Sequence, residues 1–229
     1  MIETKHIGTV LLCIPHLLFA QGNLAVEAEA EVGNSVTTSS LMGGSLELEW
    51  NAAAGFVLQG GAKWTSEAKQ TFYVANTNTF LLGKLPLQLH EKFLYNRYEA
   101  WDIQDLNFFT GLTLLRGRFD GTLGLTTRII AMIDSYDETI VEPFNLQYDL
   151  GLSLFPQPET WNIRLGASNY DDFLFERTES VIFSLGGNYR LSEQWRFQGS
   201  ANLRPAGNFG LSADYYSFYI NIGVRWLIH

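Results

Sequence analysis

The sequence has almost no cysteine, because Cys13 is the only one among its 229 residues. Cys13 lies in an apolar N-terminal segment, so the rest of the chain offers no disulfide framework, thiol nucleophile or cysteine metal site. Charged side chains are also sparse, at 17% of residues, and the net charge of -9 argues against non-specific binding to nucleic acid. After the N-terminal segment, no stretch approaches the ~18 uninterrupted apolar residues of a membrane-spanning helix.

The N-terminal segment, "MIETKHIGTVLLCIPHLLFAQG", has the features of a secretory signal. Lys5 and His6 precede an apolar run from Ile7 to Ala20. A membrane helix is the alternative, but the run is shorter than the ~20 apolar residues that a span requires. We therefore predict a signal peptide over residues 1–20, with cleavage near Ala20.

Most of the chain after residue 22 alternates apolar and polar residues. The stretch "FNLQYDLGLSLFP" at 144–156 shows the pattern, and it recurs in "SLELEWN" at 45–51 and "LNFFTGLTLL" at 106–115. Successive side chains on a β-strand point to opposite faces, so each segment has one apolar face and one polar face. No comparable 3.6-residue pattern is present, which predicts an all-β protein.

Two kinds of turn separate these segments, and they alternate along the chain. Five tight turns and six long polar loops predict about twelve strands; ten strands remain possible if residues 69–97 form an irregular hairpin outside the barrel. The strands are about ten residues long, near the ~9–11 of a tilted transmembrane strand and above the ~5–6 of soluble sheets. The tight turns lie at 51–55, 83–86, 116–118, 156–159 and 191–194, and the long loops at 33–44, 65–70, 97–103, 131–142, 170–177 and 205–214.

Aromatic residues gather at both ends of the expected strands, as the two interfaces of a membrane would favour. Those near the tight turns are Trp50, Phe119, Phe155, Trp161, Tyr189, Trp195 and Trp226. Those near the long loops are Trp64, Phe93, Tyr95, Trp101, Tyr170 and Phe173.

Over residues 21–229 the chain resembles the bacterial outer-membrane β-barrel proteins. The last strand, "YINIGVRWLIH", has the alternating apolar residues and near-terminal aromatic typical of that family, but it ends on His229. The resemblance implies one antiparallel transmembrane barrel in the outer membrane of a diderm bacterium. It also implies contact with outer-membrane lipids and with the barrel-assembly machinery. A soluble β-sandwich or jelly roll is the alternative fold.

If lipid surrounds the barrel, the polar face lines a lumen. Many of these faces carry a small residue near mid-strand, which either leaves the lumen unfilled or eases curvature of the sheet. These residues are Gly61, Gly111, Gly124, Gly151, Gly166, Gly186, Ser200 and Gly223.

Charge on the polar face is segregated along the chain. Acidic residues lie on the first two strands and basic residues on later ones, which predicts opposing walls and a transverse field. The alternative is that these charges pair, with Arg225 meeting a glutamate where the last strand closes on the first. The predicted pore-lining residues are Glu27, Glu29, Glu31, Glu47, Glu49, Lys63, Asp120, Arg128, Asp149, Arg164, Arg196, Arg204 and Arg225.

The sequence favours a passive, porin-like channel for ions or small polar solutes, with no cofactor and no metal site. One alternative is a closed structural or adhesive barrel that acts through its external loops. Another is a rim enzyme, such as an outer-membrane lipase or protease, but His90 and His229 are the only histidines after the signal and neither has a serine nearby. The acidic loops at 134–139 and 169–172 are either solvated or bind divalent cations.

Overall fold

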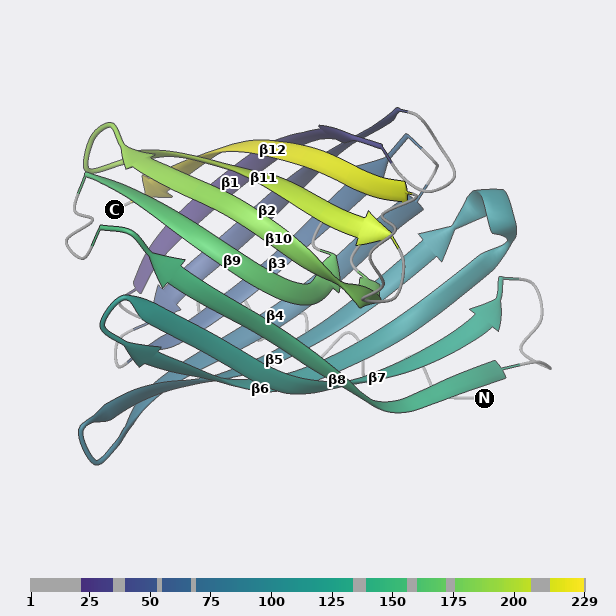
Figure 1. The fold of residues 1–229 in the computed structure, drawn as a ribbon, viewed down its shortest axis with the longest axis horizontal. Coiled ribbons are helices and arrows are strands. Elements are labelled where there is room, and N and C mark those ends of the chain that lie inside the picture. Colours follow the sequence, from purple (N-terminus) through teal and green to yellow (C-terminus); the bar gives the residue numbers. More distant parts are fainter. Residues whose placement is uncertain are drawn as a thin grey trace.

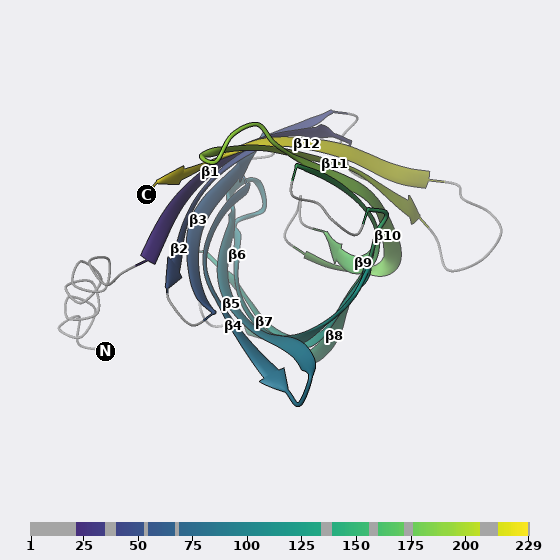
Figure 2. The same cartoon turned by 90° about the vertical axis from the view of Figure 1, so that its left-hand side faces the viewer.

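The computed structural model is a closed barrel of twelve antiparallel strands joined in chain order (Figures 1 and 2). It describes residues 22–34, 40–52, 55–66, 69–133, 139–155, 160–171, 176–206 and 215–228. The predicted signal segment and His229 lie outside these residues. Within them, no helix is both long enough and apolar enough to cross a bilayer.

The strands run 10 to 15 residues each, as the alternation predicts. Their bounds are β1 Gly22–Gly33, β2 Leu41–Ala52, β3 Phe56–Thr65, β4 Lys69–Leu82, β5 Leu85–Tyr98, β6 Ile103–Arg116, β7 Phe119–Met132, β8 Thr139–Ser153, β9 Trp161–Asp171, β10 Glu176–Arg190, β11 Trp195–Ala206 and β12 Tyr215–Ile228. A single 3₁₀ turn, η1 Glu99–Trp101, follows β5.

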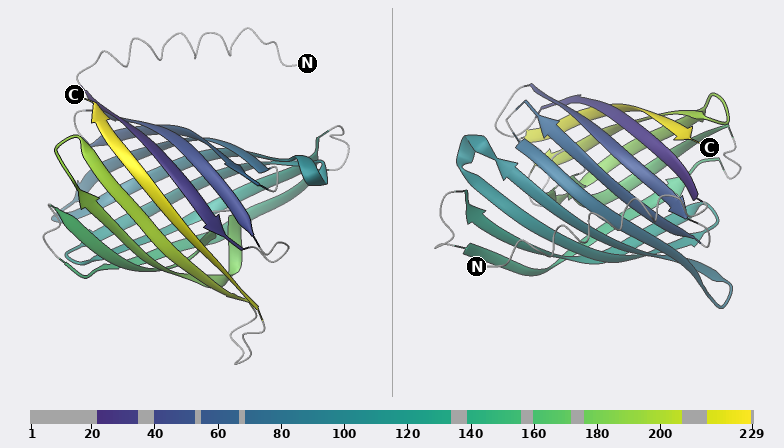
Figure 3. Two further views of the ribbon diagram at one scale, coloured as in Figure 1. Left: turned by 90° about the horizontal axis from the view of Figure 1, so that it is seen from above. Right: turned by 180° about the vertical axis from the view of Figure 1, so that it is seen from behind.

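The barrel closes where β1 meets β12, and the two strands lie side by side in Figure 3. Ten residue pairs join them, from Leu24 opposite Ile228 to Gly33 opposite Tyr219. The twelve-strand prediction is therefore confirmed.

The β4–β5 hairpin belongs to the barrel wall. Its strands pair without a break from Lys69 opposite Tyr98 to Leu82 opposite Leu85. The tight turn between them uses Gly83 at φ 66°, a left-handed conformation that glycine adopts without steric cost. The ten-strand alternative, which placed this hairpin outside the barrel, is wrong.

The placement of apolar and polar side chains is the reverse of that in a soluble protein. Large apolar side chains such as Ile222, 66% exposed, cover the outer surface, whereas polar side chains such as Asp105, 1% exposed, are buried inside. Soluble proteins bury apolar side chains and expose charged ones, so the soluble sandwich is excluded. An apolar exterior around a polar interior is the arrangement of a transmembrane barrel.

The seam between β8 and β9 is the least paired in the described part of the barrel. Five residue pairs join these strands, from Asp149 opposite Ser168 to Ser153 opposite Arg164. Beyond them, the Asn169 carboxamide accepts a hydrogen bond from the Tyr148 backbone N–H at 2.8 Å and donates to the Leu146 carbonyl at 2.9 Å. A side chain thus continues the ladder where the two backbones stop pairing.

Candidate channel lumen

Among the residues that the structure describes, two cavities lie in the interior of the barrel. A central cavity of about 280 Å³ is lined by side chains from all strands except β1, among them Glu47, Lys92 and Tyr170. A second cavity of about 250 Å³ lies beside β9 to β12 and is also lined by Glu29. Arg164 on β9 lines both, so it stands between the two spaces.

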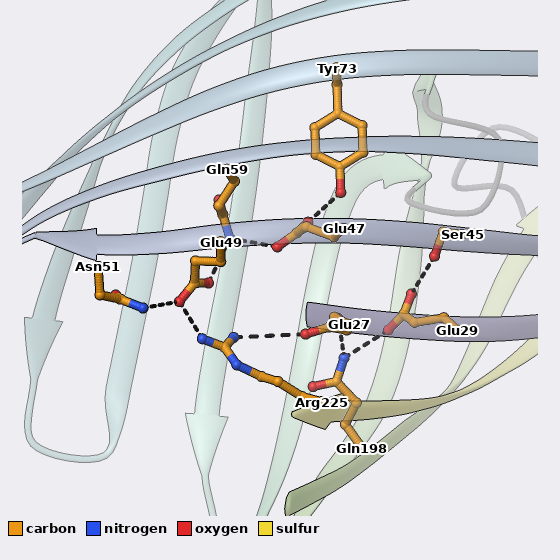
Figure 4. Close-up of polar contacts among 10 residues, drawn as sticks. All are labelled: Glu27, Glu29, Ser45, Glu47, Glu49, Asn51, Gln59, Tyr73, Gln198 and Arg225. Carbon is orange, nitrogen blue, oxygen red and sulfur yellow. Dashed lines mark hydrogen bonds and ion pairs between the residues drawn. The ribbon is translucent and has the colours of Figure 1, made fainter. Parts of the chain in front are cut away.

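Four carboxylates lie close together on β1 and β2, and we call Glu27, Glu29, Glu47 and Glu49 the acidic cluster (Figure 4). Arg225 of β12 forms ion pairs with two of them, with Glu27 at 3.7 Å and with Glu49. Strands β1 and β12 are neighbours at the closing seam, so the predicted pairing of Arg225 with a glutamate across that seam is confirmed.

Neutral donors satisfy much of the rest of the acidic cluster (Figure 4). The Gln198 carboxamide donates to Glu27 at 2.5 Å and to Glu29 at 2.8 Å. The Gln59 carboxamide donates to Glu47 at 3.0 Å and to Glu49 at 3.1 Å. The Tyr73 hydroxyl donates to Glu47, Ser45 to Glu29 at 3.5 Å, and Asn51 to Glu49 at 2.5 Å. The cluster therefore keeps an excess of formal negative charge that amides and hydroxyls stabilise.

The basic residues of later strands sit against carboxylates of their own. Arg128 pairs with Asp105 at 2.6 Å. Arg164 pairs with Asp120 at 2.8 Å and with Asp149 at 3.0 Å. The expected basic wall is thus neutralised at Arg128 and Arg164. Asp120 and Asp149 were among the predicted pore-lining residues, whereas Asp105 was not.

The other predicted pore-lining residues occupy different heights of the wall. Glu31 and Lys63 form a buried ion pair of 2.6 Å between β1 and β3. Arg196 lies opposite Arg225 in the β11–β12 pair, and Arg204 lies opposite Ser217.

Most of the small interior residues do not leave open space. A side-chain carbon added to Gly61 would lie 2.6 Å from the Tyr73 ring, and one added to Gly124 would lie 2.4 Å from the Phe109 ring. The side chains of Arg164 and Asp120 cover Gly151. Those of Glu29 and Gln198 cover Gly223. These glycines make room for long neighbouring side chains, and this differs from both roles expected from the sequence. Gly186 is the more open case, with nothing nearer than 3.9 Å.

Lys92 is a lumen residue that sequence analysis missed. Its ammonium lies 4.9 Å from the ring centre of Tyr73 on β4 and 5.8 Å from that of Tyr170 on β9. In the sequence, the charged Glu91 interrupts the apolar face of this segment and resembles a slip in the alternation, whereas β5 continues without a slip and turns Glu91 outward and Lys92 inward. Strict alternation through β5 was the signal that could have found it.

His90 also lies in the interior, held by two threonines. Thr77 is 3.0 Å from Nδ1, and Thr113 is 2.8 Å from Nε2. Both ring nitrogens therefore contact hydroxyls of threonine, and in the described residues the contacts of His90 include neither a serine nor a carboxylate.

Comparison with known proteins finds similar structures but no matching family model or curated sequence. No protein-family model matches the chain. No curated protein matches it either. The structure is similar to the KdgM porin in complex with disordered oligogalacturonate, with TM-score 0.59, 9% identity, and coverage of 90% of this chain and 99% of that one.

Two further solved structures share the architecture. The outer membrane channel from Pseudomonas putida F1 has TM-score 0.54 and 12% identity over 91% of this chain and 96% of its own. The translocator domain of the autotransporter NalP from Neisseria meningitidis has TM-score 0.51 and 14% identity over 97% and 94%. With its apolar exterior and polar interior, the chain is an outer-membrane β-barrel with the fold that these bacterial porins, channels and translocators share.

Proposed function

We propose that the barrel is a narrow passive channel for ions or small polar solutes, with a preference for cations. The observation that carries the proposal is the acidic cluster beside the two interior cavities, where Arg225 forms ion pairs with two of the four carboxylates, Glu27 and Glu49. Rings of fixed carboxylates favour cations in a pore, because a low-dielectric wall focuses their field into the aqueous path.

The distribution of the remaining charges supports the sign of this preference. Arg128 and Arg164 have aspartates as ion-pair partners, so the wall opposite the cluster adds little net positive charge. Lys92 stands in the central cavity as a further cation, between two tyrosine rings. Near the cluster, the four carboxylates outnumber Arg225 and Arg196, which lie opposite each other on β12 and β11, so the excess of negative charge is local to this part of the lumen.

The ion pairs favour a second candidate, a closed structural or adhesive barrel. Buried charges that pair across a lumen can fill it, and Arg164 stands between the two cavities. In that case the external loops would carry the function, and the lumen residues would contribute stability.

Planar-bilayer recording of refolded residues 21–229 distinguishes the two candidates. A channel shows discrete conductance steps and, under a KCl gradient, a reversal potential of cation-selective sign. The Glu29→Gln, Glu47→Gln double variant should shift the reversal potential toward zero, because it removes two of the four carboxylates. The matched control is Glu99→Gln, Glu193→Gln, which removes two exposed carboxylates outside the lumen and should leave the potential unchanged.

Each outcome decides a separate point. A folded, heat-modifiable barrel that stays silent overturns the channel and supports the closed barrel. Conductance with an unchanged reversal potential in the cluster variant refutes the acidic cluster as the source of selectivity.

A further inference from the structure

A polar row crosses the apolar exterior of the barrel between the two aromatic girdles. In register around the wall lie Leu58 on β3, Asn76 on β4, Glu91 on β5, Thr110 on β6 and Leu125 on β7. The leucines at both ends belong to the apolar outer face, and Glu91 and Thr110 are exposed on that same face. Three polar residues therefore interrupt the surface that should contact acyl chains.

Glu91 lies near the middle of β5, Leu85–Tyr98, on the outward face. On its own strand, Leu89 precedes it and Phe93 of the girdle near the long loops follows it on the same face. On β3, the row passes through Leu58, between Phe56 near the tight turn and Trp64 near the long loop. Ionisable side chains at such depth in a membrane are costly and mark functional sites with a partner.

The polar row carries both donors and acceptors. The Asn76 carboxamide donates to the Glu91 carboxyl at 3.1 Å, and the Asn78 carboxamide donates to Asn76 at 3.2 Å. A carboxyl group has four acceptor sites on two oxygens, and each carboxamide has a second N–H and a further lone pair. The chain's own bonds to these groups use part of that capacity, so a facing surface with the same groups would complement them.

The outer surface beside the polar row carries two small residues. Gly60 on β3 has no side chain, and a carbon added there would meet only the Tyr73 carbonyl oxygen, at 3.8 Å. Ala62 follows on the same outward face. Small residues let two membrane segments approach closely enough for polar groups to bond across the contact.

We propose that this outer face of β3 to β6 binds a second copy of the same chain in the membrane, with Glu91 and Asn76 at the centre of a two-fold contact. A two-fold contact uses one patch on both copies, so that patch must contain its own complement. The Asn76–Glu91 pair meets this condition, since the carboxamide of one copy can donate to the carboxyl of the other. Acyl chains offer neither donors nor acceptors, so lipid alone leaves these groups unsatisfied. The proposal is independent of whether the lumen conducts.

Cysteine cross-linking in vesicles tests the contact, because residues 21–229 contain no cysteine of their own. Leu89→Cys places a thiol on the outer face two residues from Glu91, and Leu185→Cys places one on β10, across the barrel, where the side chain is 50% exposed. With a mild oxidant, we expect a covalent dimer of Leu89→Cys and at most a tenth as much of Leu185→Cys.

Two further substitutions separate association from folding. In the Leu89→Cys background, Glu91→Leu should lower the cross-linked fraction at least tenfold while the barrel remains folded and heat-modifiable, because leucine suits a lipid-facing site. Glu91→Gln keeps the hydrogen-bonding capacity and should retain the dimer.

Three results would overturn the proposal. They are equal cross-linking at positions 89 and 185, an unchanged dimer in Glu91→Leu, and a folded Leu89→Cys barrel that does not cross-link at all. The last result would indicate that the polar row contacts a different membrane protein and not a second copy of this chain.

Discussion

The buried ion pair between Lys63 and Glu31 should be a major stabilising contact near the long-loop end of the lumen. The two side chains reach over β2 to meet at 2.6 Å, and they are 3% and 2% exposed. Removing one member of a buried pair leaves the other charge without its partner in a poorly solvated site, which costs about 3–5 kcal/mol. We therefore expect Lys63→Met to lower the free energy of unfolding by about 3 kcal/mol.

A double-mutant cycle isolates this contact from the other interactions of the two residues. Glu31→Gln should cost a similar amount to Lys63→Met, and the double variant should cost about 2 kcal/mol less than the sum of the two. The measurement is reversible urea unfolding in detergent micelles, followed by tryptophan fluorescence and by heat-modifiable migration on gels.

An exposed ion pair of this protein serves as the control. Arg97 and Glu99 lie 3.5 Å apart, and their side chains are 43% and 48% exposed. Arg97→Gln should change the free energy of unfolding by less than about 0.5 kcal/mol, because solvent screens such pairs. The reasoning is refuted if the coupling between positions 31 and 63 is below about 0.5 kcal/mol.

Two further predictions concern glycine space and backbone conformation. Gly61→Ala should lower the free energy of unfolding by about 1–3 kcal/mol, because the new carbon meets the Tyr73 ring. Tyr73→Ala in the same chain should remove this penalty in a thermal melt, and failure of that rescue would contradict a steric cause. Asp102 follows η1 in the left-handed region at φ 55°, so Asp102→Val should cost about 1–2 kcal/mol. Asp102→Gly should not lower the urea midpoint, and equal losses in both variants would count against backbone strain.

The fold could be predicted from the sequence because the alternation is nearly continuous. Strand length and the last strand indicated a membrane barrel, and the tight turns together with the long loops indicated about twelve strands. Local pattern is sufficient where every strand pairs with its neighbour in the chain. The outward turn of Glu91 was missed because a charge on an outer face looks like a register slip. The unbroken pairing of β5 with both of its neighbours shows that the strand stays in phase.

The composition of the site was predictable, but its electrostatics was not. The alternation identified most inward charges, including Glu47, Arg164 and Arg225. Which charge neutralises which depends on stagger between strands, as when Arg164 of β9 reaches Asp120 of β7 across β8. Likewise, the covering of Gly124 by Phe109 depends on a side-chain direction that spacing alone does not give.

The β8–β9 seam determines how the wall would part under load. The chain ends meet at β1 and β12, yet ten residue pairs fasten that join, whereas five fasten β8 to β9 in the described strands. A lateral force on the barrel would thus separate β8 from β9, in the middle of the chain, before it separates the two terminal strands. Beyond the five pairs, two hydrogen bonds of the Asn169 side chain join β9 to the backbone of β8. The side chain of Asn169 therefore helps to hold the wall together at its least paired seam.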